Sequence, residues 1–350
     1  MNQASNIDPD LPFCDLHRHL DGSMRLQTIL DLAEQHGIAL PARTREGLKP
    51  HVQVVGAAAG LMDFIDKFRY PGAVLVNAEA CCRVARENVE DAFHEGIDYI
   101  ELRFSPWFMA LPHRLDPGEV AAAVIEGTRA GAAATGIGVQ LIGILSRTYG
   151  PQACMAELDA LLAHRSALVG LDLAGDEKNF PPGTFAEHFR RAREAGWRIT
   201  VHAGEADGPQ SIWAAITVLG AERIGHGISA LEDPRLLDYL VKEDIGLEVC
   251  LTSNVHTRAV DDLSRHPVRK LLDHGVRLNL NTDDPGISGI DLRHEYDVAA
   301  PQAGLDRAAL RLSQINAVEM AFLDAQEKSA LIARKTGRNR TRPETGRRDA

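Results

Sequence analysis

The chain repeats one local pattern eight times: a short run of β-branched and other apolar residues that ends near Gly, Asp or Asn. Several of these runs are apolar throughout, which is typical of strands covered on both faces of a parallel sheet. The eight runs are 13–19, 97–104, 138–145, 169–175, 198–204, 223–227, 245–251 and 276–283. Segments with helical spacing of apolar residues separate most of them, at 117–131, 185–195, 211–219, 233–243 and 268–274.

This alternation predicts an α/β protein, and the count of units selects among α/β folds. Eight βα units over roughly 320 residues are typical of a (β/α)8 TIM barrel. A doubly wound sheet usually has fewer strands and a Gly-rich phosphate loop after the first. Neither GxGxxG nor GxxxxGK[ST] occurs in the sequence. We therefore expect one (β/α)8 barrel domain over residues 1–336.

The first connection is much longer than the others. Residues 20–96 are enough for several helices, and we expect them to form a helical cap inserted after the first strand. Within it, four large apolar residues stand at i, i+3, i+4 and i+7 and so share one helical face. They are Leu61, Phe64, Ile65 and Phe68. Plain core packing and a lid over a pocket both explain such a face.

The last residues differ in composition from the rest. Residues 337–350 contain no aliphatic side chain larger than Ala and are rich in Arg. They offer too little apolar surface to offset the entropy lost on ordering. We expect a disordered, basic tail.

Charge and cysteine content exclude several classes of protein. The formal net charge is −11, from 38 Lys and Arg against 49 Asp and Glu. A negative surplus repels phosphate backbones and anionic lipids, so we expect neither nucleic acid nor membrane as a partner and favour a small molecule. Five cysteines without a CxxC pair argue against a disulfide framework. With no signal-peptide pattern, a cytoplasmic protein is expected. No pattern specifies an oligomeric state.

Residues able to bind metal gather at the carboxyl ends of the predicted strands, where barrel enzymes have their active sites. His17 and His19 project from one face of the first strand because side chains alternate along a strand. Adding His202 and Asp283 gives three imidazoles and one carboxylate, the donor set of a catalytic Zn²⁺ that retains an open position for water. We expect one such ion per chain, although the same donors accept Co²⁺ or Fe²⁺.

Further polar residues at these ends suit proton transfer. Glu205 follows His202 closely enough to act as a general acid beside the metal, and it also suits a helix N-terminus. His226 can orient or deprotonate a metal-activated water, or simply bind backbone. Asp284 beside Asp283 can hold that water, although paired Asp residues are also common caps. Gly175 lets a backbone N–H approach a flat ligand, or only forms a turn.

Seven blocks in register with the strands resemble the adenosine deaminase family, bacterial type, within the metal-dependent hydrolase (amidohydrolase) barrels. They are DLHRHLDGS, ELRFSP, LDLAGDE, VHAGE, RIGHG, CLTSN and NTDDP, and the resemblance extends from about Asp15 to Lys328. It implies zinc-dependent hydrolytic deamination of adenosine and 2′-deoxyadenosine to inosine and 2′-deoxyinosine, with release of ammonia, as in purine salvage.

The resemblance also implies individual roles. His17, His19, His202 and Asp283 would hold Zn²⁺, with His19 also facing the substrate. Glu205 would protonate purine N1, His226 would act on the zinc water and Asp284 would position it. Gly175 would donate its amide to N3, Asp21 would bind the ribose 5′-hydroxyl, and Leu61, Phe64, Ile65 and Phe68 would form an apolar gate. The strand-four lysine used by two-metal relatives is absent from LDLAGDE, which favours a single zinc.

Two alternatives remain open. Related barrels deaminate adenine or 6-amino-6-deoxyfutalosine, and those relatives tend to have Glu where this chain has Asp21. A purine-binding barrel without catalysis is the second alternative, and a hydrolase that opens cyclic amides is a further variant of the enzyme hypothesis. Every expected catalytic position holds a chemically competent residue, which favours the deaminase.

Overall fold

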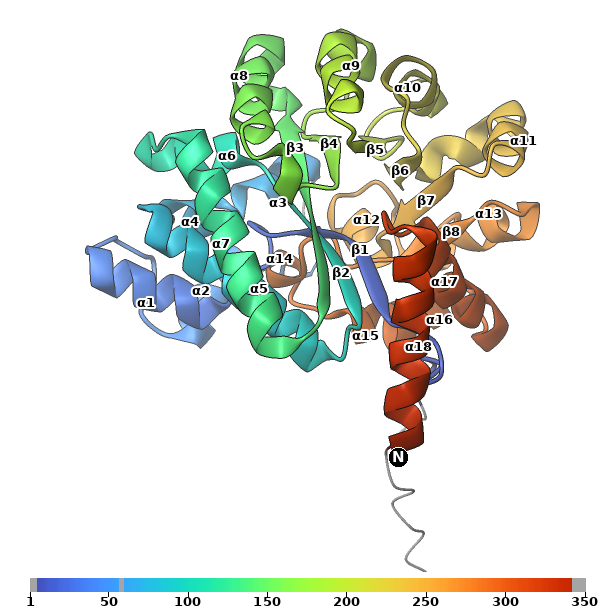
Figure 1. Cartoon of the computed structure of the whole chain (residues 1–350), viewed down its shortest axis with the longest axis horizontal. Coiled ribbons are helices and arrows are strands. Elements are labelled where there is room, and N and C mark those ends of the chain that lie inside the picture. Colours follow the sequence, from blue (N-terminus) through green and yellow to red (C-terminus); the bar gives the residue numbers. More distant parts are fainter. Residues whose placement is uncertain (1–4, 57–59, 342–350) are drawn as a thin grey trace, which may run out of the picture.

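The computed structural model describes residues 5–56 and 60–341, and for residues 61, 62 and 338–341 it describes the backbone alone. Its centre is one sheet of eight parallel strands in the order β1 to β8, surrounded by helices (Figure 1). The expected (β/α)8 barrel is confirmed, and each strand lies within its predicted run. The strands are β1 (Cys14–His19), β2 (Tyr99–Phe104), β3 (Gly138–Ser146), β4 (Gly170–Ala174), β5 (Arg198–Ala203), β6 (Arg223–His226), β7 (Gly246–Val249) and β8 (Leu278–Leu280), with β3 reaching one residue beyond.

The barrel closes between its last and first strands just after β8. The Asp283 N–H donates to the His17 carbonyl at 2.8 Å, and the His19 N–H donates to the Asp283 carbonyl at 2.7 Å. The β1–β2 register shifts between Asp15 and Arg18, so β1 carries one extra residue there. Such a bulge re-aims neighbouring side chains. Barrel closure thus fixes the backbone of three of the expected metal ligands.

Helices connect the strands and cover the outside of the barrel. Those predicted from periodicity are present, and 268–274 coincides with α13. The helices are α1 (Leu26–His36), α2 (Arg45–Val52), α3 (Leu61–Asp66), α4 (Arg69–Ala73), α5 (Ala78–Glu95), α6 (Pro106–Ala110), α7 (Pro117–Thr135), α8 (Gly150–Leu162), α9 (Ala186–Glu194), α10 (Pro209–Ala214), α11 (Pro234–Lys242), α12 (Leu251–His256), α13 (Val268–His274), α14 (Pro285–Ser288), α15 (Leu292–His294), α16 (Ala300–Gln302), α17 (Arg307–Met320) and α18 (Ala325–Thr341). Shorter helical turns are η1 (Leu111–His113), η2 (Arg147–Tyr149), η3 (Arg165–Ala167), η4 (Pro182–Phe185), η5 (Ala215–Leu219), η6 (Ile228–Glu232), η7 (Leu263–Arg265) and η8 (Glu295–Ala299).

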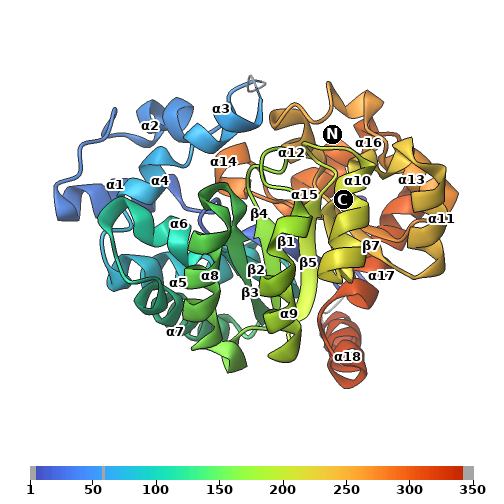
Figure 2. The same ribbon diagram turned by 90° about the horizontal axis from the view of Figure 1, so that it is seen from above.

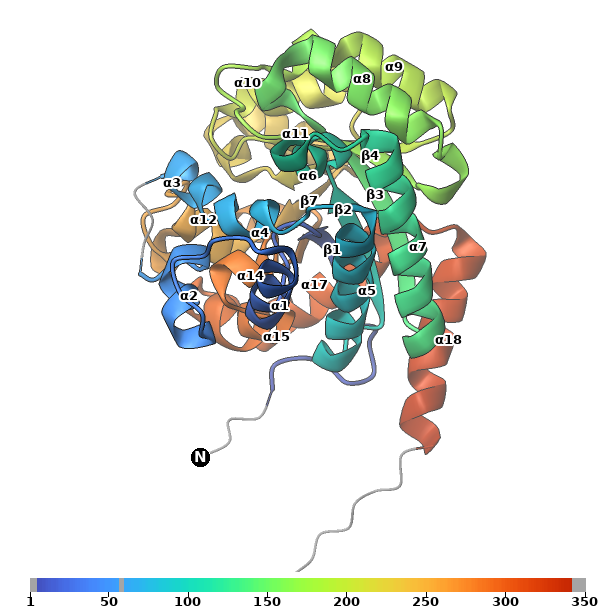
Figure 3. The same ribbon diagram turned by 90° about the vertical axis from the view of Figure 1, so that its left-hand side faces the viewer.

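The long first connection contains α1 to α5. Helices α1–α4 lie together beside α14 at one side of the barrel (Figures 2 and 3). Two hydrogen bonds join the segment after α2 to α14: the Val54 N–H donates to the Ile287 carbonyl at 2.9 Å, and Gln53 Nε2 donates to the Gly286 carbonyl at 2.9 Å. The insertion is therefore tied to the loop that leaves β8, beside the barrel mouth.

The apolar face expected at 61–68 is interrupted. Helix α3 ends at Asp66 and α4 begins at Arg69, so Phe68 lies between two short helices rather than on one continuous helix. Phe64 is buried, Ile65 and Phe68 are partly exposed, and the side chain of Leu61 lies outside the described residues. The backbone N–H of Lys67 donates to carbonyl groups of α3 and so caps this helix, which ends before Phe68.

The main apolar core lies between the strands and the surrounding helices, and a second apolar cluster lies at the amino-terminal end of the barrel. In the second cluster Cys14 and Tyr99, at the starts of β1 and β2, pack with Ala317 of α17 and Leu331 of α18. Helix α18 then projects beyond the barrel (Figures 1 and 3). It continues to Thr341, past position 337 where the sequence predicts the tail to begin, and the predicted tail residues 342–350 lie outside the described residues.

Helices α5 and α7 pack unusually closely, and both have well-defined ends. The Asn77 side chain accepts the Ala80 N–H at the start of α5, and Asp116 accepts the Glu119 N–H at the start of α7. A Cβ atom added at Gly127 of α7 would lie 2.1 Å from the carbonyl oxygen of Cys82 in α5. Only glycine permits this approach of the two backbones.

Among the described residues, no helix is long and apolar enough to span a membrane.

Gly127→Ala should therefore destabilise the fold. We expect a loss of about 1–3 kcal/mol in the free energy of unfolding, since the methyl group overpacks a backbone contact. Urea unfolding followed by circular dichroism measures it. Gly183→Ala is the control, because a Cβ there meets no atom within 4 Å. Equal stability of the two variants would contradict the close packing inferred for α5 and α7.

Candidate metal centre and active site

The expected metal ligands meet at the carboxyl-terminal mouth of the barrel. His17 and His19 come from β1, His202 from β5, and Asp283 from the segment after β8. His17 Nε2 and His19 Nε2 lie 3.0 and 3.2 Å from His202 Nε2, and both lie 3.2 Å from Asp283 Oδ1. His226, at the end of β6, joins them: ligand atoms of His17, His202, His226 and Asp283 all lie within 4.8 Å of one another.

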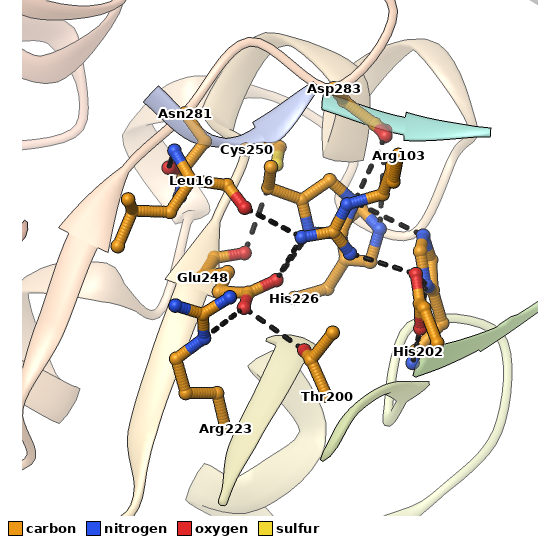
Figure 4. Close-up of polar contacts among 12 residues, drawn as sticks. Leu16, Arg103, Thr200, His202, Arg223, His226, Glu248, Cys250, Asn281 and Asp283 are labelled. Atoms are coloured by element: carbon orange, nitrogen blue, oxygen red, sulfur yellow. Dashed lines mark hydrogen bonds and ion pairs between the residues drawn. The ribbon is translucent and has the colours of Figure 1, made fainter. Parts of the chain in front are cut away.

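The outer nitrogens of two of these histidines are held by buried carboxylates (Figure 4). His17 Nδ1 lies 2.8 Å from Glu248 Oε2, and His202 Nδ1 lies 2.9 Å from Asp172 Oδ2. In each pair the Nδ1–H donates a hydrogen bond to the carboxylate, so the ring proton lies on Nδ1 and the two Nε2 lone pairs face each other with no hydrogen between them. Burial also lowers the pKa of both histidines, which favours the neutral ring.

Facing lone pairs need a cation between them, and this donor set therefore fits a metal ion. Imidazole nitrogens with a carboxylate oxygen suit Zn²⁺ and neighbouring transition metals. Ser253 Oγ donates to Asp283 Oδ2 at 2.6 Å, which orients this carboxylate as well. The sequence predicts His17, His19, His202 and Asp283 as ligands, but it does not indicate any of these supporting partners.

One fully buried guanidinium connects the two supporting carboxylates. Arg103 of β2 lies 2.8 Å from Asp172 and 2.7 Å from Glu248, and it also donates to the Leu16 carbonyl at 2.6 Å (Figure 4). Burial alone raises the pKa of Asp172, but His202 and Arg103 outweigh it and the pKa falls below its ordinary value. The two carboxylates therefore stay ionised as acceptors for the histidines.

The same charge network continues below Glu248. Arg223 Nε lies 2.6 Å from Glu248 Oε1, and Arg223 Nη2 lies 2.5 Å from Glu101 Oε2. Thr200 Oγ1 donates to Glu248 Oε1 at 2.9 Å. Burial raises the pKa of Glu248, but Arg103 and Arg223 lower it well below its ordinary value. Several strands thus contribute ionic groups to the interior of the barrel, directly beneath the metal cluster.

Two residues of the site have backbone conformations that side chains disfavour. His226 has φ of 62° and Asp283 has φ of 63°, both in the left-handed region. Such strain gathers at functional sites, where surrounding contacts hold it in place. Here the Asn254 side chain lies 3.0 Å from His226 Nδ1, and the β1 backbone holds Asp283 on both sides. The strained turns direct both side chains into the cluster.

Glu205 lies beside the cluster rather than capping a helix. Its Oε2 is 3.6 Å from His226 Nε2, and its Oε1 accepts a hydrogen bond from Thr257 Oγ1 at 3.0 Å. Burial raises its pKa, with smaller opposing effects from His226. A buried carboxyl with a raised pKa keeps its proton to a higher pH than an exposed carboxyl does, which suits a general acid.

The loop that carries Glu205 is held by another carboxylate, Glu177 at the end of the LDLAGDE block. Glu177 accepts the N–H groups of four successive loop residues at 2.6 to 3.2 Å. They belong to residues 204–207. The role of Glu177 could not be predicted, because an acidic residue after one strand carries no information about the loop that follows the next strand.

A pocket opens directly above the metal cluster. Besides the ligands it is lined by all three acids expected in the site, by Gly175 and by the described gate residues. These are Asp21, Glu205 and Asp284, with Phe64, Ile65 and Phe68, and further residues include Ser105, Phe108, Ile144, Ser146, Thr148, Tyr149, Ala174 and Thr257. The ring centroids of Phe64 and Phe68 are 6.1 Å apart, and those of Phe68 and Phe108 are 5.8 Å apart.

Two carboxylates in this pocket have a free acceptor atom. Asp21 Oδ1 and Asp284 Oδ1 are buried without a hydrogen-bond partner. Burial, followed by the neighbouring charge of Asp283, raises the pKa of Asp284. Gly175 has φ of 109°, and a Cβ there would lie 2.4 Å from Thr148 Oγ1, so glycine is required. Asp21 and Asp284 therefore each offer an unpaired acceptor atom to a ligand in the pocket.

The barrel, its histidine and aspartate cluster and its acidic pocket define the class of protein as an amidohydrolase-type barrel hydrolase. Comparison with known proteins gives the family. A model of the family described as adenosine deaminase matches residues 12–335. This chain therefore belongs to the adenosine deaminase family.

Curated relatives agree with the family model. Proteins named adenosine deaminase from Escherichia coli O1:K1 and Escherichia coli O157:H7 are 55% identical to this chain over 325 residues, covering 93% of this chain and 98% of theirs. The match thus includes nearly the whole barrel, with its insertion and its site.

Solved structures show how widely the fold is used. An adenine deaminase from Arthrobacter aurescens is 28% identical with a TM-score of 0.87, covering 94% of this chain and 99% of that one. An amidohydrolase from Burkholderia ambifaria, solved with bound Zn, is 25% identical with a TM-score of 0.83 and covers 94% and 91%. An N6-methyl-AMP deaminase from Arabidopsis thaliana is 26% identical with a TM-score of 0.79 and covers 94% and 97%.

Asp172→Asn should weaken metal binding without removing a ligand. The amide loses the charge that holds the His202 ring, and changes of this kind reduce metal affinity by roughly 10–100-fold. Chelator competition with metal analysis measures the affinity. Asp159→Asn is the matched control, because Asp159 pairs with Arg191 on the surface and is 59% exposed. Unchanged affinity in Asp172→Asn would contradict the orienting role.

Proposed function

We propose that this chain is a zinc-dependent hydrolase that deaminates adenosine and 2′-deoxyadenosine to inosine and 2′-deoxyinosine with release of ammonia. One observation carries the proposal: a buried carboxyl group, Glu205, lies 3.6 Å from His226 at the edge of the cluster of proposed metal ligands, which opens into a pocket lined by apolar and acidic residues. This arrangement supports addition of water to a protonated heteroaromatic ring. The family membership and the names of the 55% identical relatives support the substrate.

In this proposal His17, His19, His202 and Asp283 hold one Zn²⁺ per chain. A bound zinc ion supplies hydroxide at neutral pH by lowering the pKa of water. His226 lies beside the cluster on the Glu205 side and removes or orients the water proton. Asp284, with its free Oδ1, positions the attacking water. His19 also lines the pocket and so faces the substrate.

The substrate is held so that its ring meets these groups. Glu205 donates its proton to purine N1, which makes C6 more electrophilic. The backbone N–H of Gly175 donates to N3, and its glycine conformation keeps that N–H accessible. Phe64, Ile65 and Phe68, with Leu61 as a further proposed member, cover the apolar faces and limit the access of bulk water.

We propose that the sugar end of the pocket selects nucleosides over nucleotides and free bases. Asp21, with its free Oδ1, accepts a hydrogen bond from the ribose 5′-hydroxyl. Among the described residues that line the pocket there is no Lys or Arg, whereas acids are abundant. A substrate phosphate would therefore meet carboxylates without a compensating cation. The Arabidopsis neighbour differs in this respect, because the substrate in its name, N6-methyl-AMP, is a nucleotide.

Other features complete the proposal. The catalytic unit is a single barrel with the helical insertion after β1 as its cap. The five free cysteines support a reducing compartment such as the cytoplasm. The alternatives are deamination of adenine or 6-amino-6-deoxyfutalosine, and a purine-binding barrel without catalysis. The 28% identical adenine deaminase makes adenine the specific competitor to test.

An ultraviolet assay of the purified, metal-analysed protein with adenosine and with adenine tests the proposal directly. We expect conversion of adenosine to inosine at about one zinc per chain, lost on chelation and restored by zinc.

Glu205→Gln should keep substrate binding while turnover falls roughly 10²–10⁴-fold, because the substitution removes a general acid and leaves every metal ligand in place. Glu194→Gln, on an exposed helix, is the control. Unchanged turnover in Glu205→Gln would refute the proton-donor role.

Asp21→Ala should distinguish a nucleoside substrate from a free base. The variant should lose roughly 10–100-fold in kcat/KM for adenosine, because a hydrogen bond to a charged group is removed. Adenine lacks the sugar and should change little, measured as turnover or as competitive inhibition. Equal losses for both compounds would rule out the contact between Asp21 and the ribose.

A further inference from the structure

Three polar residues, none of them a proposed metal ligand, form a chain of hydrogen bonds at the wall of the pocket. Ser105 follows β2, Ser146 ends β3, and Glu157 lies in α8 behind them. Both serines line the pocket, whereas Glu157 is 1% exposed and lies beneath them. The functions assigned above use none of the three.

The direction of these hydrogen bonds is fixed by the carboxylate. Glu157 accepts the Trp107 N–H at 3.1 Å and the Ser146 N–H at 2.8 Å, and both hydrogen bonds favour its ionised form. Burial outweighs them and raises its pKa to about 7, so the group is a carboxylate above that pH. An ionised carboxylate cannot donate, so the Ser105 hydroxyl donates its proton to Glu157 Oε1, at 2.5 Å.

The proton of Ser146 is then committed as well. Because the Ser105 hydroxyl hydrogen is donated to Glu157, Ser105 Oγ can only accept from its other partners. They are the Phe108 N–H at 2.9 Å and Ser146 Oγ at 2.8 Å. Ser146 therefore has no proton left for the pocket. It offers lone pairs alone, and a ligand group that meets it must be a hydrogen-bond donor.

Asp21 lines the same pocket as Ser105 and Ser146. Asp21 Oδ1 also lacks a partner. Asp21 Oδ1 and Ser146 Oγ are therefore two separate hydrogen-bond acceptors in the pocket, and a sugar supplies several hydroxyl groups that can donate to them.

We propose that Ser146, oriented by Ser105 and Glu157, is a specificity-determining residue that accepts a hydrogen bond from a ribose hydroxyl of the substrate. The inference rests on the proposed nucleoside substrate and adds a second sugar contact to it. A site built to accept from a hydroxyl group discriminates against analogues that lack it, because its acceptor is left without a partner. Ser105 and Glu157 act through Ser146 and are positioning residues.

The test compares wild-type protein and Ser146→Ala with adenosine and its 2′-deoxy, 3′-deoxy and 5′-deoxy analogues. Burial raises the pKa of Glu157 to about 7, so assays at about pH 8.5 keep it ionised. The ratio of kcat/KM for adenosine to kcat/KM for the analogue that lacks the contacted hydroxyl should be roughly 10-fold smaller in Ser146→Ala than in the wild type. Identical relative losses on all four nucleosides would overturn the contact. Ser211→Ala, which removes another buried serine hydroxyl outside the pocket, is the control.

Calorimetric binding of inosine and its deoxy analogues repeats the comparison without turnover. Failure of deamination and failure of the Ser146 contact are therefore distinguishable. If the wild type does not deaminate adenosine, the proposed reaction fails while binding still decides the contact.

Ser105→Ala tests the orientation separately. It leaves the Ser146 hydroxyl in place but removes the acceptor of its proton, which frees Ser146 to turn that proton toward the pocket. Discrimination for the same hydroxyl should fall by a similar factor, with Ser146 still present. Full discrimination in a folded Ser105→Ala protein would overturn the relay. Should this variant fail to fold through loss of the α6 cap, Ser105→Gly removes the same acceptor with a residue that is tolerated at an N-cap.

Discussion

The site depends on one buried guanidinium. Arg103 lies between Asp172 and Glu248, at 2.8 and 2.7 Å, and these two carboxylates hold the outer nitrogens of His202 and His17. Without its charge Asp172 would lose its guanidinium partner and Glu248 would keep only Arg223, and breaking buried ion pairs in this way costs several kcal/mol. The position of the metal cluster is therefore set by groups deeper in the barrel, and the ligands inherit their geometry from that layer.

The same logic of oriented protons extends across the pocket. Carboxylates below the metal cluster commit the Nδ1 protons and leave Nε2 lone pairs for a cation. Glu177 collects backbone N–H groups and fixes the loop of Glu205, whereas Glu157 commits the hydroxyl protons of two serines. In each case a buried acceptor decides what the pocket presents to a ligand. Buried, satisfied networks of this kind are rigid and specify one arrangement.

Much of the fold could be predicted from the sequence because its determinants are local. The eight apolar runs coincide with β1 to β8, since strand length and Gly, Asp or Asn endings are written in each short segment. The expected ligands His17, His19, His202 and Asp283 also meet, because parallel strands bring their carboxyl ends to one rim. The break between α3 and α4 was not foreseen, since four apolar residues at helical spacing do not reveal where the backbone turns.

The sequence by itself determined the barrel, the rim of metal-capable residues and the acids beside them. Tertiary structure alone decided which carboxylate faces which histidine: Glu248 lies 231 residues from His17 along the chain, and Asp172 lies 30 from His202. It also decided the direction of the Ser146 hydrogen bond, because that direction follows from Ser105 and from Glu157 of helix α8. Local sequence encodes which residues can bind, but proton placement depends on neighbours that only long-range packing supplies.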